Sequence, residues 1–209
     1  MNFDRVAPYY RHLETLVFGH QLQEARVAFV RQIHSPRRVL VVGEGNGRFL
    51  AEFVRAHPQA EIDCIEPSAR MIALARERAT SSKVHFIHAD LRNLQLERAT
   101  YDLVVTHFLL DCFDQSTLPA VIEKLSHAAA ANAQWLIADF FEPPRGWKRF
   151  RARGLIALMY RFFRLVARIE ADCLVDYRPL LRRHGFVAQQ ARDSPDEMIR
   201  SELWERVSG

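Results

Sequence analysis

The stretch from Arg37 to Phe53, RRVLVVGEGNGRFLAEF, constrains the fold of this chain more than any other. It begins with an apolar run, continues through three glycines spaced two apart, and ends in a segment with the apolar spacing of a helix. A buried strand that turns through glycines into a helix usually faces a nucleotide-like ligand at the crevice of an α/β sheet. Several ligand classes use such a turn, so the surrounding residues must identify the ligand.

Strands and helices alternate along the rest of the chain. Apolar periodicity predicts a leading helix over residues 9–33 and further helices over 46–56, 68–80, 117–130 and 149–169. Ser68 stands at the N-cap position of the helix over 68–80. Strand patterns lie at 38–43, 61–66, 84–90, 101–108, 133–141, 185–191 and 198–207.

This alternation predicts crossover units and a largely parallel sheet. The last two strands are separated only by RDSPDE at 192–197, which is too short for a crossover helix, so they should pair antiparallel. No internal repeat or low-complexity linker divides the sequence. We therefore expect one α/β domain over residues 1–209, with a helical cap over 1–34 and the core over 35–209.

The three glycines do not fit the dinucleotide-binding pattern G-x-G-x-x-G. They form G-x-G-x-G at Gly43, Gly45 and Gly47, and Arg48 stands where the dinucleotide pattern needs its third glycine. Counting from Gly45 places Leu50 at that position, so the pattern fails in both registers. A nicotinamide-dependent oxidoreductase is therefore disfavoured.

Two acidic residues close the strands that follow the glycine turn. Glu66 ends the strand at 61–66, where a carboxylate can accept hydrogen bonds from both ribose hydroxyls. Asp90 ends the strand at 84–90, where a carboxylate can accept from an exocyclic amine such as that of adenine. Either acid alone is more often a helix cap or a solvated group. The ordered set of glycine turn and two acids predicts an adenosine-binding cradle.

On these motifs the chain resembles the class I S-adenosylmethionine-dependent methyltransferases, over roughly residues 35–209. The resemblance implies a Rossmann-like, seven-stranded, mostly parallel sheet in the order 3-2-1-4-5-7-6, with helices on both faces. It implies S-adenosyl-L-methionine as the cofactor. The glycines would line its methionine and ribose end, Glu66 would hold the ribose, and Asp90 would hold the adenine. The residues assigned to the cofactor in this way are Gly43, Gly45, Gly47, Glu66, Pro67, Ala89, Asp90, Leu91 and Thr106.

One position departs from the family pattern. The family often has an acid two residues before the first glycine, which helps to hold the methionine amino group, and this chain has Val41 there. The sequence leaves open whether Glu44 or backbone carbonyls take over that role, or whether cofactor binding is weak. At the N-terminus, FDRVAPYY is similar to the opening of quinone-biosynthesis methyltransferases, in which a tyrosine folds over cofactor and substrate. Tyr10 matches that tyrosine by its spacing from Ala7, and packing on the core is an equal alternative.

Methyl transfer from a sulfonium requires alignment of the acceptor and exclusion of water, and it requires a base only where the acceptor carries a proton. Candidate bases at the ends of the fourth and fifth strands are His107, Asp111 and Asp139. His107 is the best of them by its free pKa near neutrality, although histidines at strand ends are more often structural. Three phenylalanines would wall an apolar pocket or belong to the core, namely Phe108, Phe140 and Phe141.

The acceptor is predicted to be a small and hydrophobic molecule. Methyltransferases of nucleic-acid amines carry a [D/N]-P-P-[Y/F] turn after the fourth strand, whereas this chain has THFLLD there and a Pro-Pro pair only at 143–144. The net charge is +4, so nucleic acid is not an expected partner.

The segment at 147–171 predicts a basic amphipathic helix, with Arg153, Arg161, Arg164 and Arg168 near one face. The favoured interpretation is a crossover helix with its arginines in water. The alternatives are peripheral contact with an anionic membrane through residues 148–168, or a cover over a lipophilic substrate.

Three hypotheses remain: a small-molecule methyltransferase, a binding protein of the same fold with weak or no activity, and a peripheral membrane module. The three cysteines are widely spaced and form no zinc signature, so we expect no metal site. The N-terminus is polar and no apolar run reaches ~20 residues, and together with the cysteines this predicts a cytoplasmic protein. The sequence does not identify the acceptor atom or the oligomeric state.

Overall fold

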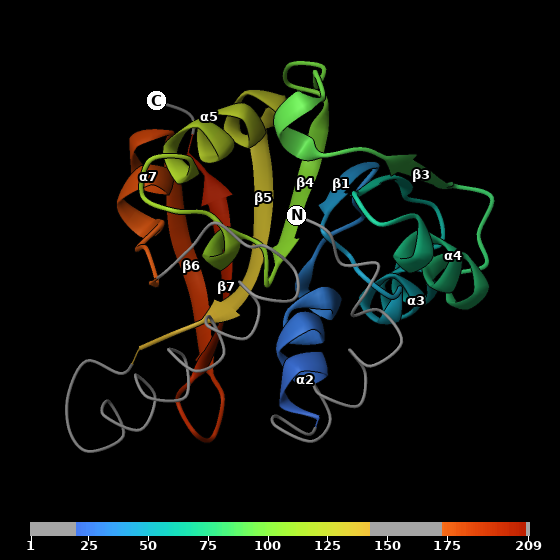
Figure 1. The fold of residues 1–209 in the computed structure, drawn as a ribbon, viewed down its shortest axis with the longest axis horizontal. Helices are drawn as coiled ribbons and strands as arrows, with labels where there is room; N and C mark the ends of the chain where they lie inside the picture. The colour runs from blue at the N-terminus through green and yellow to red at the C-terminus, as the bar shows by residue number, and fades with distance from the viewer. Residues whose placement is uncertain (1–19, 143–172, 208–209) are drawn as a thin grey trace.

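The computed structural model describes residues 20–142 and 173–207 of the chain. Its centre is a seven-stranded sheet in the order β3-β2-β1-β4-β5-β7-β6, which confirms the expected order (Figure 1). The strands from β1 to β5 run parallel, and β7 pairs antiparallel with both β5 and β6. The strands are β1 (Arg38–Val42), β2 (Glu61–Glu66), β3 (Val84–His88), β4 (Tyr101–His107), β5 (Ala129–Phe140), β6 (Phe186–Asp193) and β7 (Ile199–Arg206).

Helices bury both faces of this sheet. On one face, Phe49, Leu50 and Phe53 of α3 pack with Val39 and Val41 of β1. On the other, the apolar side of α5 and Leu181 of α7 pack around Trp135. The helices are α2 (Gln21–Val27), α3 (Arg48–Ala56), α4 (Ala69–Arg78), α5 (Leu118–Ala128) and α7 (Arg178–Arg183), with short 3-10 turns η1 (Val30–Gln32), η2 (Leu91–Asn93) and η3 (Leu110–Cys112).

The start of β5 differs from the sequence-based prediction. The helix predicted over 117–130 ends at Ala128, and the strand predicted over 133–141 already begins at Ala129. The alanine-rich run at 128–133 favours a helix by local propensity. Pairing of Ala129 with Tyr101, the first residue of β4, overrides that preference. The helix α7 is not predicted at all, because its six residues are too few to produce a clear periodicity.

Only part of the helix predicted over 9–33 falls within the described residues. There, α2 ends at Val27 and does not continue to residue 33. The backbone leaves the helical conformation at Phe29 (φ −117°), and the 3-10 turn η1 follows. The basic segment predicted as a helix over 149–169 lies outside the described residues. Among the residues that the structure describes, no helix has both the length and the apolar character needed to cross a membrane.

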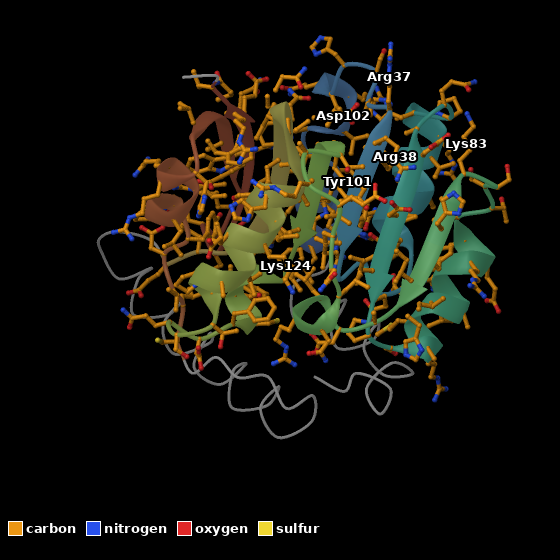
Figure 2. All side chains as sticks on the ribbon, turned by 90° about the horizontal axis from the view of Figure 1, so that it is seen from above. Arg37, Arg38, Lys83, Tyr101, Asp102 and Lys124 are labelled. Carbon is orange, nitrogen blue, oxygen red and sulfur yellow. The ribbon has the colours of Figure 1, made fainter. Side chains whose placement is uncertain are left out.

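Charged side chains fix the amino-terminal edge of the parallel strands (Figure 2). The guanidinium of Arg38 donates to Glu61 (3.0 Å) and Asp63 (3.1 Å), and the Tyr101 hydroxyl donates to the same Asp63 carboxylate at 2.8 Å. The Asp102 carboxylate accepts from the backbone N–H of Arg37 at 2.9 Å. These contacts join β1, β2 and β4, and their parallel register brings the carboxyl ends of the three strands to one edge.

Lys124 of α5 supports the turn that follows β3. Its ammonium donates to the carbonyls of Leu91, Arg92 and Leu94 at 3.0, 2.7 and 3.1 Å. Figure 2 shows Lys124 over the middle of the molecule, between α5 and this turn. Lys124 thus satisfies three carbonyls that would otherwise need water as a hydrogen-bond partner, and it holds η2 beside the carboxyl edge of the sheet.

Candidate functional site

The glycine turn after β1 has a left-handed backbone at each glycine, with φ of 72° at Gly43, 70° at Gly45 and 83° at Gly47. A Cβ at Gly47 would lie 2.5 Å from the Cα of Ala75, so this glycine allows α3 to approach α4. A Cβ at Gly45 would meet no atom within 4 Å. The backbone at Gly45 therefore has space beside it for a ligand.

Glu44 closes the amino end of α3. Its Oε1 accepts from the backbone N–H groups of Phe49 and Leu50, both at 3.1 Å, and its side chain is buried. Burial raises the pKa of Glu44 to about 7, although these two hydrogen bonds and the charge of Arg26 act in the opposite direction. At neutral pH this carboxyl is thus poised between its two protonation states.

Glu66 connects the glycine turn to β2. Its Oε2 accepts from the N–H of Gly45 at 3.0 Å, and its Oε1 accepts from the N–H of Ser68 at 3.0 Å. Each carboxylate oxygen can accept more than one hydrogen bond, so a carboxylate at this position suits the two hydroxyls of a ribose. Ser68 in turn caps α4 by accepting from Met71 N at 3.2 Å, which confirms the predicted cap.

A cavity joins these groups at the carboxyl edge of the sheet. It is lined by Glu66 and Pro67 at the end of β2, and by Glu44, Arg26 of α2 and Phe108. The Arg26 side chain is buried, and its guanidinium carbon lies 4.9 Å from the ring centroid of Phe108. In Figure 1, α2 lies at the end of the sheet toward which the arrowhead of β5 points. The donor and acceptor set of the cavity fits a ligand with a diol at Glu66 and a charged group near Arg26.

Sequence reasoning missed several residues of this cavity, namely Arg26, Asn46, Met71, Leu109 and Cys112. One signal could have found Arg26: it is a charged residue within the apolar run of ARVAFV.

Apart from Gly47, which follows the lining residue Asn46, four of the described residues predicted to contact the cofactor are not part of the described lining of this cavity. Thr106 is buried on the far side of β4, where its hydroxyl accepts from Trp135 Nε1 at 2.9 Å. The Asp90 carboxylate accepts from Arg92 Nε and Arg92 N, both at 3.0 Å, and these bonds lower the pKa of Asp90. Ala89 and Leu91 flank Asp90 along the chain. Tyr10 lies outside the described residues.

His107 ends β4 and lines the cavity. Its ring packs edge-on against Phe49, with the centroids 4.6 Å apart, and its Nδ1 has no hydrogen-bond partner among the described residues. Burial, together with the charge of Arg26, lowers the pKa of His107 to about 3. The ring is therefore neutral and weakly basic at pH 7, which weighs against the expectation that it is the best base of the three candidates.

Asp111 and Asp139 lie apart from His107. Their carboxyls hydrogen-bond to each other, and the Asp111 N–H donates to Asp139 Oδ2 at 3.3 Å. They line a neighbouring cavity together with Phe140 and Phe141. Within residues 20–142 and 173–207, no group of three or more His, Cys, Asp and Glu side chains is placed to hold a metal ion.

Residues 39–140 match a family model described as a methyltransferase domain. Demethylmenaquinone methyltransferase of Chlamydia pneumoniae is 26% identical over 153 residues, which are 73% of this chain and 66% of that protein. Malonyl-[acyl-carrier protein] O-methyltransferase of Halalkalibacterium halodurans is 31% identical over 86 residues, which are 39% of this chain and 32% of that protein. The matches thus span two thirds or less of the length of these two relatives.

Solved structures share the fold. An O-methyltransferase family protein from Burkholderia thailandensis superposes with a TM-score of 0.71 at 17% identity, covering 97% of this chain and 60% of that one. An S-adenosylmethionine-dependent methyltransferase from Mesorhizobium loti has a TM-score of 0.66 at 16% identity, covering 88% of this chain and 100% of that one.

Proposed function

We propose that this chain, which belongs to the class I methyltransferases by its fold and by the domain at residues 39–140, transfers a methyl group from S-adenosyl-L-methionine to a small molecule. Its similarity to quinone-biosynthesis members of the family supports the proposal. The observation that carries the proposal is the cavity that extends from Glu66 to Arg26. One end offers a carboxylate to a ribose, and the other offers a guanidinium and a carboxyl to an α-amino acid.

The charges at the second end complement a methionine zwitterion. Arg26 provides a buried guanidinium for the ligand's carboxylate, and Glu44 provides an acid for its ammonium. Within the described residues, both hydrogen bonds of Glu44 fall on Oε1, which leaves Oε2 for the ligand. Glu44 would thus replace the acid that is missing at Val41, whose side chain is buried in the core.

Bound S-adenosyl-L-methionine would supply an electrophilic methyl carbon next to its sulfonium. The chain's own residues would orient the cofactor from both ends, through Glu66 and through Arg26 with Glu44. Phe108 and Leu109 would exclude water between these ends.

The names of the relatives support a metabolite as acceptor. They specify demethylmenaquinone and a malonyl group on an acyl carrier protein. The fold without activity is the weaker hypothesis, because the charged groups at both ends of the cavity are retained.

Calorimetric titration with S-adenosylhomocysteine, with NADH as the competing ligand class, tests the proposal. We expect micromolar binding of S-adenosylhomocysteine alone. Glu66→Gln and Glu66→Ala should weaken it about ten- to a hundredfold, which corresponds to roughly 1.5–3 kcal/mol for hydrogen bonds to a charged group. Glu77→Ala, which removes an exposed carboxylate of α4, is the matched control. Binding of NADH instead, or of neither ligand, would refute the proposal.

A further inference from the structure

A second cavity lies beside the cofactor cavity, at the carboxyl end of β5. It is bounded by the ends of β5 and β7 and by the segment that leads into α7. Asp111 lines this second cavity, and the next residue, Cys112, lines the cofactor cavity. Similarly, the ring of Phe140 in the second cavity lies 5.3 Å from the ring of Phe108 in the first. The two cavities are therefore adjacent, and a methyl donor held in one would lie next to an acceptor held in the other.

The volume of the second cavity is about 150 Å³. An engineered protein cavity of about this size holds benzene, so one aromatic ring fits. Phe140 and Phe141 provide aromatic walls. The guanidinium carbon of Arg200 lies 3.8 Å from the ring centroid of Phe141, which holds that wall in place. Size and walls together favour a planar, single-ring molecule.

Asp111 and Asp139 provide one negative charge in this cavity. They are 8% and 2% exposed, and their carboxyls are in contact. Two dry carboxyls in contact cannot both ionise at little cost, so they hold one proton between them near neutral pH. Burial raises the pKa of Asp111 to about 6, and burial with the neighbouring charge of Asp111 raises the pKa of Asp139 well above its usual range. The pair can therefore accept one more proton at pH 7.

Glu202 provides a second acceptor. It is 3% exposed, and the Tyr177 hydroxyl (3.0 Å) and Trp204 Nε1 (2.9 Å) both donate to its Oε2. In the part of the chain that the structure describes, Oε1 of Glu202 has no hydrogen-bond partner. Asp139 pairs with Arg200 across the β5–β7 ladder, so Glu202 lies diagonally opposite Asp139 on the same face of the sheet. The Cα atoms of such diagonal neighbours are roughly 7–8 Å apart. One small molecule can thus donate to Asp111 or Asp139 and to Glu202 together.

The charges in the cavity also distinguish between acceptor classes. Its two arginines are already paired, Arg178 with Asp176 at 2.7 Å and Arg200 with Asp193 at 2.6 Å. Among the described residues that line the cavity, a carboxylate substrate would meet the buried acids without a free cation to balance them. A protonated amine would form an ion pair with the acids, and its lone pair would not be available for attack. A neutral molecule with hydroxyl groups satisfies both acceptors without these costs.

On the basis of the proposed function, we propose that this cavity binds the methyl acceptor, that the acceptor is a neutral single-ring arene with two hydroxyls, and that Asp111 takes the proton of the reacting hydroxyl. The acceptor oxygen forms its bond to the methyl carbon as the carbon–sulfur bond of the sulfonium breaks, and sulfur keeps that electron pair. The hydroxyl proton passes to the Asp111 carboxylate and later to water.

Catechol, benzylamine and benzoate are three one-ring probes that distinguish these classes, since at pH 7 they are a neutral diol, a protonated amine and a carboxylate. Each is titrated by calorimetry onto the full chain, with and without saturating S-adenosylhomocysteine. We expect catechol to bind and the other two to bind at least tenfold more weakly. Asp111→Asn and Glu202→Gln should each weaken catechol about tenfold and leave the affinity for S-adenosylhomocysteine unchanged. Glu123→Gln, an exposed acid on α5, should change neither.

A second readout is the monomethyl ether of catechol, detected by mass spectrometry after incubation with S-adenosyl-L-methionine. Asp111→Asn should slow its formation at least tenfold at pH 7 and abolish the rise in rate between pH 5 and 7. No binding of catechol, equal binding by the variants, or a preference for benzylamine or benzoate would overturn the inference. Catechol binding that depends on Asp111 and Glu202, without binding of S-adenosylhomocysteine, would instead refute the proposed function alone.

Discussion

The guanidinium of Arg26 stacks over the ring of Phe108, with 4.9 Å between its central carbon and the ring centroid. The two residues are 82 positions apart in the sequence and belong to α2 and to the end of β4. This contact brings a buried positive charge to the cofactor cavity. The same charge adds to the effect of burial in lowering the pKa of His107, and it partly opposes the rise that burial causes in the pKa of Glu44.

Replacement of Arg26 should affect only ligands that carry a carboxylate. In Arg26→Met, we expect S-adenosylhomocysteine to bind about ten- to a hundredfold more weakly, since a charge-assisted hydrogen bond contributes roughly 1.5–3 kcal/mol. 5′-Methylthioadenosine, which lacks the amino-acid part, should bind as in the wild type. Calorimetry with both ligands measures this difference, and Arg31→Met, an exposed arginine of η1, is the control. Equal weakening of both ligands would contradict the assignment.

Glu44 should make the folded protein less stable as the pH rises. Its pKa is about 7 in the fold and near 4.5 in the unfolded chain, so its contribution is complete below about pH 4.5 and is lost as the pH rises through about 7. This pKa shift contributes about 3 kcal/mol to the free energy of unfolding at low pH. Urea denaturation should show that the free energy of unfolding of the wild-type protein declines between pH 4.5 and 7.5. In Glu44→Gln this decline should be smaller by the same amount. Parallel curves for the two proteins would show that Glu44 does not titrate in this way.

The two glycines Gly45 and Gly47 should respond differently to substitution by alanine. Gly47→Ala places a Cβ 2.5 Å from the backbone of Ala75 in addition to the strain at φ 83°, so we expect a loss of more than 2 kcal/mol of unfolding free energy. Gly45→Ala has strain alone, about 1–2 kcal/mol, because no atom lies within 4 Å of its new Cβ. Its larger effect should be on the binding of S-adenosylhomocysteine. Thermal unfolding and calorimetry separate the two effects.

His107 should not titrate in the physiological range. Burial and Arg26 keep its pKa near 3, so its ring resonances should stay constant between pH 5 and 8 in an NMR titration. The resonances are assigned by their loss in His107→Gln. In Arg26→Met the pKa of His107 should rise, because the nearby positive charge is gone. A midpoint near 6.5 in the wild-type protein would restore His107 as a candidate base.

Within the described residues, the sequence by itself determined the succession of strands and helices, apart from α7, and the antiparallel pairing of β6 with β7. These features depend on local patterns: apolar periodicity, the glycines at 43, 45 and 47, and a linker at 192–197 too short for a crossover helix. Glu66 was predictable for the same reason, since it directly ends a strand. Where local propensity conflicted with pairing, as at Ala129, the prediction was wrong.

Only the tertiary structure decided which charged groups meet. The approach of Arg26 to Glu44 and Phe108 depends on how α2 packs over the sheet, and no local pattern encodes that. His107 and Asp139 both end strands, yet the fold places them in different cavities. Their pKa values followed from burial, which is a property of the packed molecule and not of the residue type. The hydrogen bond from the Asp111 N–H to Asp139 Oδ2 joins residues 28 positions apart and exists only because η3 folds back over β5.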